Sequence, residues 1–279
     1  MSSELKIDEI GYWSEVKLSI LEEYAKPYNQ ILRSHNLYPN YVDGFAGAGH
    51  HKAKGSDRVI DGSPTRALNI DPPFDSFYFV DSDEGRVLEL QRLSAGRSNV
   101  HVHHGDCNKV LISEVFPKIS YANRQRALCI LDPYGLDLDW QVIQTAGKSK
   151  VTEIFLNFPV MDMNRNVFWR NYDGVSPSNQ ERMTRFWGDD SWKEAAYSTT
   201  QGLFEKMEEK TSNEEVAEAF RNRLKEVAGF KHVPKPMPMR NSKSAIVYYL
   251  FFAAQEPAAD KIVKAIFAKY AHRGEIPNG

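Results

Sequence analysis

A short apolar run passes directly into a glycine-rich turn at Tyr41-Val42-Asp43-Gly44-Phe45-Ala46-Gly47-Ala48-Gly49. The first five residues have the composition of a buried β-strand. Glycines after a strand let a ligand approach the backbone closely, where N–H groups can hold it. The same glycines also suit a plain tight turn. The stretch predicts a strand and turn of an α/β fold, and it makes Asp43, Gly44, Phe45, Gly47 and Gly49 candidates for a cofactor site.

Apolar runs and helical patterns alternate on both sides of this turn. Further strands are predicted at residues 77–80, 100–102, 127–131 and 153–158, and connecting helices at residues 64–70, 84–93 and 108–115. A longer amphipathic helix is predicted at about residues 14–35, with a kink at Pro27. Alternation of this kind indicates parallel strands that are joined by helical crossovers.

The C-terminal part predicts an antiparallel hairpin, with arms at residues 231–239 and 245–253 around the polar turn Asn241-Ser242-Lys243. The first arm has prolines at alternate positions, namely Pro234, Pro236 and Pro238. Because their missing N–H groups would all lie on one side, this arm should be the sheet edge. The apolar second arm should then pair with the strand at residues 153–158. We therefore expect a mostly parallel seven-stranded sheet that ends in an antiparallel hairpin.

About seventy residues, 160–230, separate the fifth strand from this hairpin. Their pattern is mainly helical, and the charge run Lys206–Lys210 is typical of a solvated helix face. We expect this segment to be a helical insertion that packs on the same domain. Residues 1–279 would then form a single domain.

Composition and charge narrow the classes of function. The net charge of −2 argues against binding to nucleic acid through a global basic field, so only a local basic surface could do this. Cys107 and Cys129 are too few for a disulfide framework and indicate reduced thiols. Residues 1–6 lack the apolar run of a secretory signal, and the apolar stretch at residues 245–254 is too short to span a bilayer. A cytoplasmic location is expected.

Two acids follow predicted strands at positions where a nucleotide could be held. Asp81 ends the second strand, where a carboxylate can accept hydrogen bonds from two ribose hydroxyls. Asp106 and Cys107 follow the third strand, where the acid could accept an adenine N6 proton. Aspartate is also a common turn residue, so a solvated loop acid is the alternative at both places.

The fourth predicted strand ends in Leu131-Asp132-Pro133-Tyr134-Gly135. A carboxylate and a backbone carbonyl at such a turn can accept both N–H protons of an exocyclic amine, while Tyr134 stacks on the base. Catalysis would then consist mainly of positioning. The same residues can form a simple turn, but strand-end groups occur in series along this chain. Asp132, Pro133 and Tyr134 are therefore the candidate catalytic residues.

Trp13 and Lys17 are four residues apart and share a face of the predicted first helix. The lysine could hold the carboxylate of a cofactor, and the indole could cover its adenine or methionine part. A surface lysine beside a tryptophan at the start of a helix is the alternative.

His101, His103 and His104 form the densest group of histidines in the chain. Alternation along a strand places His101 and His103 on one face and His104 on the other. Neither a cysteine nor another histidine of suitable spacing joins them, so no metal site is expected.

Six stretches of the chain carry a resemblance. They are Trp13…Lys17, Tyr41–Gly49, Gly62-Ser63-Pro64, Gly105-Asp106-Cys107-Asn108, Leu131-Asp132-Pro133-Tyr134-Gly135 and Leu156-Asn157-Phe158-Pro159. Together they resemble the three-Cys-motif partner (TcmP) family of bacteria, over most of the chain and least at residues 160–230. That family is similar to class I methyltransferases. The resemblance implies a Rossmann-like fold, S-adenosylmethionine as cofactor and a separate three-cysteine-motif protein as partner.

A more distant similarity concerns the target of the reaction. The series of Trp…Lys, glycine turn and Asp-Pro-Tyr is similar to adenine-N6 DNA methyltransferases, whose usual pattern is Asp-Pro-Pro-Tyr. The single Pro133 is closer to the Asp-Pro-Phe of a guanine-N2 tRNA methyltransferase. The resemblance therefore leaves the target base open.

The leading hypothesis is an N-methyltransferase that acts on an exocyclic amine of a nucleobase in DNA or RNA. The insertion would contact the polymer through its aromatic and basic residues Trp169, Arg170, Arg182, Arg185 and Trp187. The alternative for this segment is an ordinary helical cap. Two other functions stay open: a non-catalytic subunit that binds S-adenosylmethionine or a related nucleotide, and a methyltransferase for a small molecule or protein amine.

Overall fold

The computed structural model describes residues 8–169, 174–201, 206–241 and 243–271. Residues 1–6, which lack the apolar run of a secretory signal, lie outside these ranges, as do Arg170 and Ser242.

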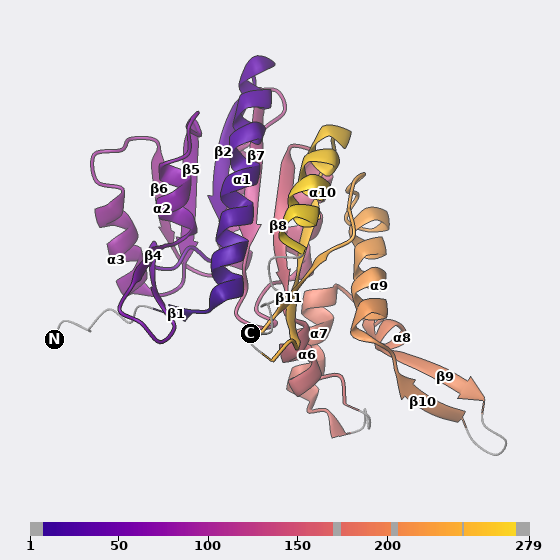
Figure 1. Cartoon of the computed structure of the whole chain (residues 1–279). Coiled ribbons are helices and arrows are strands. Elements are labelled where there is room, and N and C mark those ends of the chain that lie inside the picture. The colour runs from indigo at the N-terminus through magenta and orange to yellow at the C-terminus, as the bar shows by residue number, and fades with distance from the viewer. Residues whose placement is uncertain (1–7, 170–173, 202–205, 242, 272–279) are drawn as a thin grey trace.

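A seven-stranded sheet forms the centre of the fold, in the order β11-β12-β8-β7-β2-β5-β6 (Figure 1). The strands are β2 (Tyr38–Asp43), β5 (Ser76–Asp81), β6 (Val100–His104), β7 (Gln125–Leu131), β8 (Thr152–Phe158), β11 (Met237–Arg240) and β12 (Ile246–Ala253). The pairs among β6, β5, β2, β7 and β8 are parallel, whereas β12 runs antiparallel to both β8 and β11. The expected α/β fold, with a mostly parallel sheet that ends in an antiparallel hairpin, is confirmed.

The proline-rich arm lies at the edge of the sheet, as its missing N–H groups require. The paired part is shorter than residues 231–239, because β11 begins at Met237 and only Pro238 falls within it. A register irregularity between Met239 and Arg240 ends the regular pairing. The apolar arm β12 lies between this edge and β8, so its side chains are buried on both faces of the sheet.

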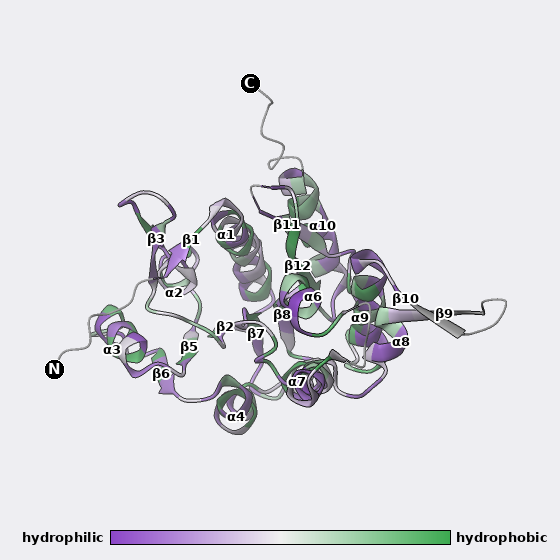
Figure 2. Cartoon of the chain, turned by 90° about the horizontal axis from the view of Figure 1, so that it is seen from below, coloured by the Kyte–Doolittle hydropathy of each residue, from purple (hydrophilic) through white to green (hydrophobic). Residues whose placement is uncertain are grey.

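Helices cover both faces of the sheet. They are α1 (Tyr12–Ser34), α2 (Ser63–Leu68), α3 (Glu84–Leu93), α4 (Cys107–Val110), α5 (Trp140–Ser149), α6 (Val160–Asn166), α7 (Pro177–Trp187), α8 (Trp192–Ala196), α9 (Asn213–Glu226) and α10 (Pro257–Ala271). A π-helical turn (Leu111–Val115) and a 3-10 turn (Phe116–Lys118) continue α4. Figure 2 shows α1 and α10 on one side of the sheet, and α4 and α7 on the other.

Each face of the sheet has its own apolar core because side chains alternate along the strands. In β7, Leu128 and Ile130 pack with α1 and α10, whereas Cys129 and Leu131 pack on the opposite side. Cys129 is fully buried there, as its apolar context predicted. The long α1 contains Pro27 and packs through Tyr24, whose ring lies 4.8 Å from the ring of Phe252.

Two smaller sheets lie outside the central one. The first consists of β1 (Glu9–Ile10), β3 (His50–Ala53) and β4 (Val59–Asp61). The second is an antiparallel pair of β9 (Tyr197–Gln201) and β10 (Lys206–Lys210), which projects from the body (Figure 1). The prediction of a helix face at Lys206–Lys210 is therefore wrong. Lysine, methionine and glutamate favour helices, but strand pairing with the threonine-containing β9 outweighs this preference here.

The helices given above differ in length from 4 to 23 residues. None of them, within the ranges given above, combines the length and the apolarity that crossing a membrane requires.

A carboxyl group is buried at the amino end of β8. The Tyr24 hydroxyl donates a hydrogen bond of 2.5 Å to Glu153 Oε2. Burial raises the pKa of Glu153 to about 7, against the opposing effect of the Tyr24 hydrogen bond. A folded-state pKa above the unfolded value means that the neutral carboxyl group is favoured in the fold. Stability from this group is present below the unfolded pKa and is lost as the pH rises through about 7.

Glu153→Gln should therefore flatten the pH dependence of stability. Between pH 5 and pH 8, the wild type is expected to lose on the order of 2 kcal/mol more than the variant, since one pKa unit corresponds to about 1.4 kcal/mol. Urea denaturation at both pH values measures this difference. Glu256→Gln removes a neighbouring charge that contributes to the raised pKa of Glu153, so it should flatten the pH dependence only in part. Parallel profiles for wild type and Glu153→Gln would contradict the assignment.

Candidate functional site

A cavity of about 490 Å³ opens where β2, β7 and β8 end. Its wall includes Phe45, Ala46 and Gly47 after β2, the turn Asp132–Gly135 after β7, and Asn157 and Pro159 from the end of β8. Lys17 of α1, the N-terminal residues Asp8–Ile10 and Tyr248 of β12 complete it. The carboxyl ends of parallel strands meet at one edge, so segments far apart in the sequence converge here.

The structure brings together six of the residues expected in the site. Lys17, Phe45, Gly47, Asp132, Pro133 and Tyr134 all line the cavity. The other candidates, Trp13, Asp43, Gly44, Gly49, Asp81, Asp106 and Cys107, are not part of its described wall. These seven lie behind or beside the wall, and their contacts show what each of them does.

Lys17 and Asp132 form an ion pair between Nζ and Oδ2 at the base of the cavity. The side chains are 10% and 34% exposed, respectively. Burial alone would lower the pKa of the Lys17 ammonium, but Asp132 and Tyr248 outweigh that effect and raise the pKa above its ordinary value. Lys17 is therefore charged and lies between the glycine turn and the Asp132 turn.

The glycine turn is held by Asp81 from the next strand. The Gly47 N–H donates to Asp81 Oδ2 at 2.8 Å, and the Asp83 N–H donates to Oδ1 at 2.9 Å. Gly47 has a φ of +66°, and a Cβ there would meet no atom within 4 Å. The turn thus presents an open backbone surface to the cavity, although its Gly47 N–H is already used within the protein. Asp81 is 5% exposed and holds the turn through its hydrogen bond with the Gly47 N–H.

Asp43 and Gly44 lie underneath the turn. Asp43 is fully buried, and its Oδ1 accepts a hydrogen bond of 3.3 Å from the Phe45 N–H. Burial raises the pKa of Asp43 to about 6, against hydrogen bonds from Ser63 and Phe45. A Cβ at Gly44 would lie 2.8 Å from Cys107 Sγ, so this glycine permits close packing between β2 and α4.

Asp106, Cys107, Gly49 and Trp13 make their contacts within the protein. Asp106 is exposed and caps α4, since its Oδ1 accepts the Asn108 N–H at 2.9 Å. Burial raises the pKa of the Cys107 thiol well above its ordinary value. A Cβ at Gly49, where φ is +83°, would lie 2.8 Å from Leu93. Trp13 packs against the core beneath α1.

A network that the sequence did not indicate anchors Tyr134. Its hydroxyl donates to Asp8 Oδ2 at 2.9 Å, and it accepts a hydrogen bond of 3.1 Å from Arg86 Nη1. Arg86 Nη2 also donates to Asp8 Oδ2 at 2.8 Å. Two of these three residues, Asp8 and Arg86, come from segments 78 positions apart, so no local pattern could have revealed the contact. The ring itself stays 58% exposed.

The far wall of the cavity comes from the end of β8 and from α6. Asn157, Asp162 and Arg165 line it. A Cβ at Gly135, where φ is +63°, would lie 2.7 Å from Asp162 Oδ2, so only glycine lets the Asp132 turn approach α6 this closely. Asn157 belongs to one of the stretches that carry the family resemblance, but its place in the cavity follows only from the fold.

The histidines near β6 make local contacts. His103 Nδ1 lies 3.0 Å from Glu114 Oε2, and His104 Nε2 lies 3.1 Å from the Ser82 carbonyl oxygen. The ring of His101 stacks on Tyr78. In the part of the chain that the structure describes, no group of three or more His, Cys, Asp or Glu side chains could hold a metal ion.

The polymer contacts expected from the insertion need correction. Trp187 is 2% exposed and packs against Phe220, so the prediction that it contacts the polymer is wrong. Aromatic residues in a helical insertion can form its hydrophobic core instead of a binding surface, and the Trp187 ring does so here. Arg182 and Arg185 already pair with Asp137 and Asp139, at 3.2 and 3.4 Å. Only Trp169 of the described tryptophans is largely exposed, at 43%.

Comparison with known proteins informs the fold. No protein-family model and no curated protein sequence matches the chain. The solved structure of LPL1258 from Legionella pneumophila str. Philadelphia 1 has a TM-score of 0.52 at 13% identity, and covers 95% of this chain and 94% of its own. Two presumed methyltransferases give lower values. One is yhhF from Escherichia coli, with a TM-score of 0.35 at 12% identity, which covers 83% of this chain and 84% of its own. The other is a protein of Thermobifida fusca YX, with a TM-score of 0.42 at 12% identity, which covers 87% of this chain and 82% of its own. LPL1258 therefore shares the α/β fold along nearly the whole chain.

Proposed function

We propose that this protein is an S-adenosylmethionine-dependent N-methyltransferase with a Rossmann-like class I fold, which acts on an exocyclic amine of a nucleobase in DNA or RNA. One observation carries the proposal. The glycine turn, Lys17 and the Asp132-Pro133-Tyr134 turn come from three separate segments and line the same cavity. A cofactor subsite and an amine subsite would thus share one wall.

The residues present fit the cofactor. The open backbone surface at Gly47 allows close approach of a ligand, and the charged Lys17 offers a partner for a carboxylate. Asp81 would accept ribose hydroxyls with its remaining lone pairs while it holds the turn. When bound, S-adenosylmethionine supplies an electrophilic methyl group.

The chain's own residues would position the amine. Asp132 accepts one N–H of the substrate, and the Pro133 carbonyl oxygen accepts the other, which fixes the direction of the amine lone pair. Tyr134 offers its exposed ring for stacking, and Asp8 and Arg86 fix the orientation of that ring. Lys17 holds the Asp132 carboxylate in place.

The same ion pair favours a second candidate function. If Lys17 holds Asp132 permanently, the acid is not available to a substrate amine. The chain would then bind S-adenosylmethionine or a related nucleotide without turnover, as a subunit for the three-cysteine-motif protein that the family resemblance implies.

Purification followed by mass spectrometry of bound small molecules and nucleic acid separates these functions. The purified protein is then incubated with S-adenosylmethionine that carries a labelled methyl group, with total cellular DNA or RNA. Label in a nucleobase supports the methyltransferase. Cofactor binding without transfer to any nucleic acid, also with the partner present, supports the second candidate.

Asp81→Ala should weaken S-adenosylmethionine binding by about 1–3 kcal/mol, because the ribose hydroxyls and the Gly47 N–H would both lose an acceptor. Isothermal calorimetry measures this change. Asp83→Ala is the matched control: it removes the cap of α3 through the Arg86 N–H but no group of the proposed cofactor subsite. Equal affinity of wild type and Asp81→Ala would exclude Asp81 from the cofactor site.

A further inference from the structure

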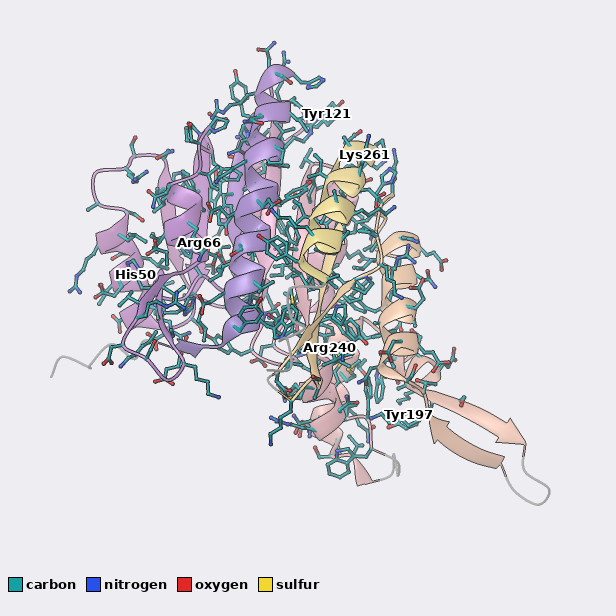
Figure 3. All side chains as sticks on the ribbon, in the orientation of Figure 1. His50, Arg66, Tyr121, Tyr197, Arg240 and Lys261 are labelled. Carbon is teal, nitrogen blue, oxygen red and sulfur yellow. The ribbon has the colours of Figure 1, made fainter. Side chains whose placement is uncertain are left out.

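An exposed tryptophan is fixed in orientation beside the cavity. The Trp169 Nε1–H donates to the Arg165 carbonyl oxygen at 2.7 Å. The Tyr197 hydroxyl, at the base of the β9–β10 hairpin (Figure 3), donates to the Trp169 carbonyl oxygen at 2.9 Å. A Cβ at Gly174 would lie 3.5 Å from Trp169 Cε3, so the ring packs on that backbone. With 43% of its surface exposed, Trp169 is a preorganised stacking surface.

Two cations on α6 and β10, Arg165 and Lys210, have no carboxylate partner in the part of the chain that the structure describes, and Lys210 Nζ lies 6.0 Å from the ring of Phe168, the residue before Trp169. Arg165 lines the cavity and is exposed, and it makes no ion pair within residues 8–169, 174–201, 206–241 and 243–271. Lys210 Nζ donates to Asn164 Oδ1 at 2.7 Å, and no carboxylate of the same ranges lies within ion-pair distance. Arg182 and Arg185 differ in this respect, because each already has an aspartate partner. We call Arg165, Trp169 and Lys210 the α6 rim.

Two of the acids of the cavity wall are paired with cations. Asp132 pairs with Lys17, and Asp8 pairs with Arg86. The Asp162 carboxylate accepts a hydrogen bond from Asn166 Nδ2. Among the lysines and arginines of the wall, Arg165 differs from Lys17 because it has no carboxylate partner in the described ranges.

We propose that the α6 rim binds single-stranded nucleic acid, so that a neighbouring base stacks on Trp169 while Arg165 and Lys210 contact phosphates. This inference rests on the proposed function, since it places the target base in the cavity beside Asp132. A base in a duplex has no free face for an indole, and its amine is out of reach of a cavity wall. Aromatic platforms next to unpaired cations are the usual means of holding single strands.

The test uses fluorescein-labelled 12-nucleotide single strands of mixed sequence, one of DNA and one of RNA, and the duplex of the same sequence. Fluorescence anisotropy gives affinities over a series of salt concentrations. Trp169→Ala is expected to weaken single-strand binding roughly 5- to 150-fold, the range for loss of one base stack. Trp169→Phe should retain most of the affinity, and a DNA or RNA preference identifies the polymer.

The salt dependence tests the cations separately. Arg165→Gln should reduce the slope of log affinity against log salt by about 0.7, the value for one phosphate contact on a single strand. Arg182→Gln is the matched control, because Arg182 is already neutralised by Asp137, and it should leave the slope unchanged.

Three results would overturn the inference: salt-independent binding, equal binding of duplex and single strand, or wild-type affinity in both Trp169→Ala and Arg165→Gln. Loss of binding to the three-cysteine-motif protein in the rim variants, with no strand binding in the wild type, would make the rim a protein-docking surface instead. Calorimetry with S-adenosylmethionine separates this from the proposed function. A wild type that binds the cofactor but not the strands refutes the rim alone, whereas one that binds strands but no cofactor refutes the methyltransferase.

Discussion

Asp132→Asn is expected to lower the rate of methyl transfer roughly 10²- to 10³-fold, and to change the Kd for S-adenosylmethionine only a few-fold. The size of the loss corresponds to removal of one preorganised polar group that acts in the transition state. Asparagine has nearly the same shape but carries no charge, and one of its two terminal atoms donates instead of accepting. Single-turnover assays with labelled S-adenosylmethionine, together with calorimetry, measure the two quantities.

Asp137→Asn is the matched control for this experiment. Asp137 follows in the same loop, pairs with Arg182 and is not part of the cavity wall. Its loss should leave both rate and cofactor affinity within a few-fold of the wild type. Thermal unfolding of Asp132→Asn is measured in parallel, because the variant leaves Lys17 without its carboxylate partner. Loss of cofactor binding in a folded Asp132→Asn protein would show that Asp132 faces the cofactor.

Sheet topology was largely predictable from the sequence because local constraints encode it. The alternation of apolar strands and helices fixed the parallel part, and the missing N–H groups of the prolines placed the first hairpin arm at the edge. Both arguments rest on chemistry within a few neighbouring residues. The paired length of β11 was not predictable, since Pro234 and Pro236 could belong to a strand or to the segment before it.

The candidate site was predictable only in its outline. A strand end indicates which residues reach the carboxyl edge of the sheet, but not whether a side chain faces the cavity or supports a neighbour. Asp43 and Asp81 show the difference, because both carboxylates accept hydrogen bonds from backbone N–H groups of the glycine turn. Asp43 accepts the Phe45 N–H and Asp81 accepts the Gly47 N–H. The contact of Asp8 with Arg86 and Tyr134 depends on tertiary packing and has no local sequence pattern.

Lys17 shows how one residue can serve both halves of the site. Its position four residues after Trp13 predicted a shared helix face and a role in holding a cofactor carboxylate, and the structure adds its partner Asp132. A charged lysine next to a carboxylate can accept a second anionic partner, because its ammonium group has three donors. The cofactor carboxylate and Asp132 could thus be held together, which would couple the two subsites.

Lys17→Met should therefore weaken S-adenosylmethionine binding roughly 10- to 150-fold, the effect of losing a hydrogen bond between charged groups. Methionine preserves much of the apolar stem of lysine, so the packing of α1 is retained. Decarboxylated S-adenosylmethionine provides a direct test, because it lacks the group that Lys17 would bind. The wild type should prefer the intact cofactor by the same factor, and Lys17→Met should bind both compounds about equally.

Two further variants decide whether Lys17 acts on the cofactor or only on Asp132. Lys26→Met removes an exposed lysine of the same helix that pairs with Glu22, and it should leave the preference for the intact cofactor unchanged. The double variant Lys17→Met/Asp132→Asn completes a double-mutant cycle. If Lys17 binds the cofactor itself, its replacement weakens binding as much in the Asp132→Asn background as in the wild type. If Lys17 only holds Asp132, Lys17→Met retains both the affinity for S-adenosylmethionine and the preference for the intact cofactor over its decarboxylated form. Such a result would show that no residue of α1 tested here binds the cofactor carboxylate.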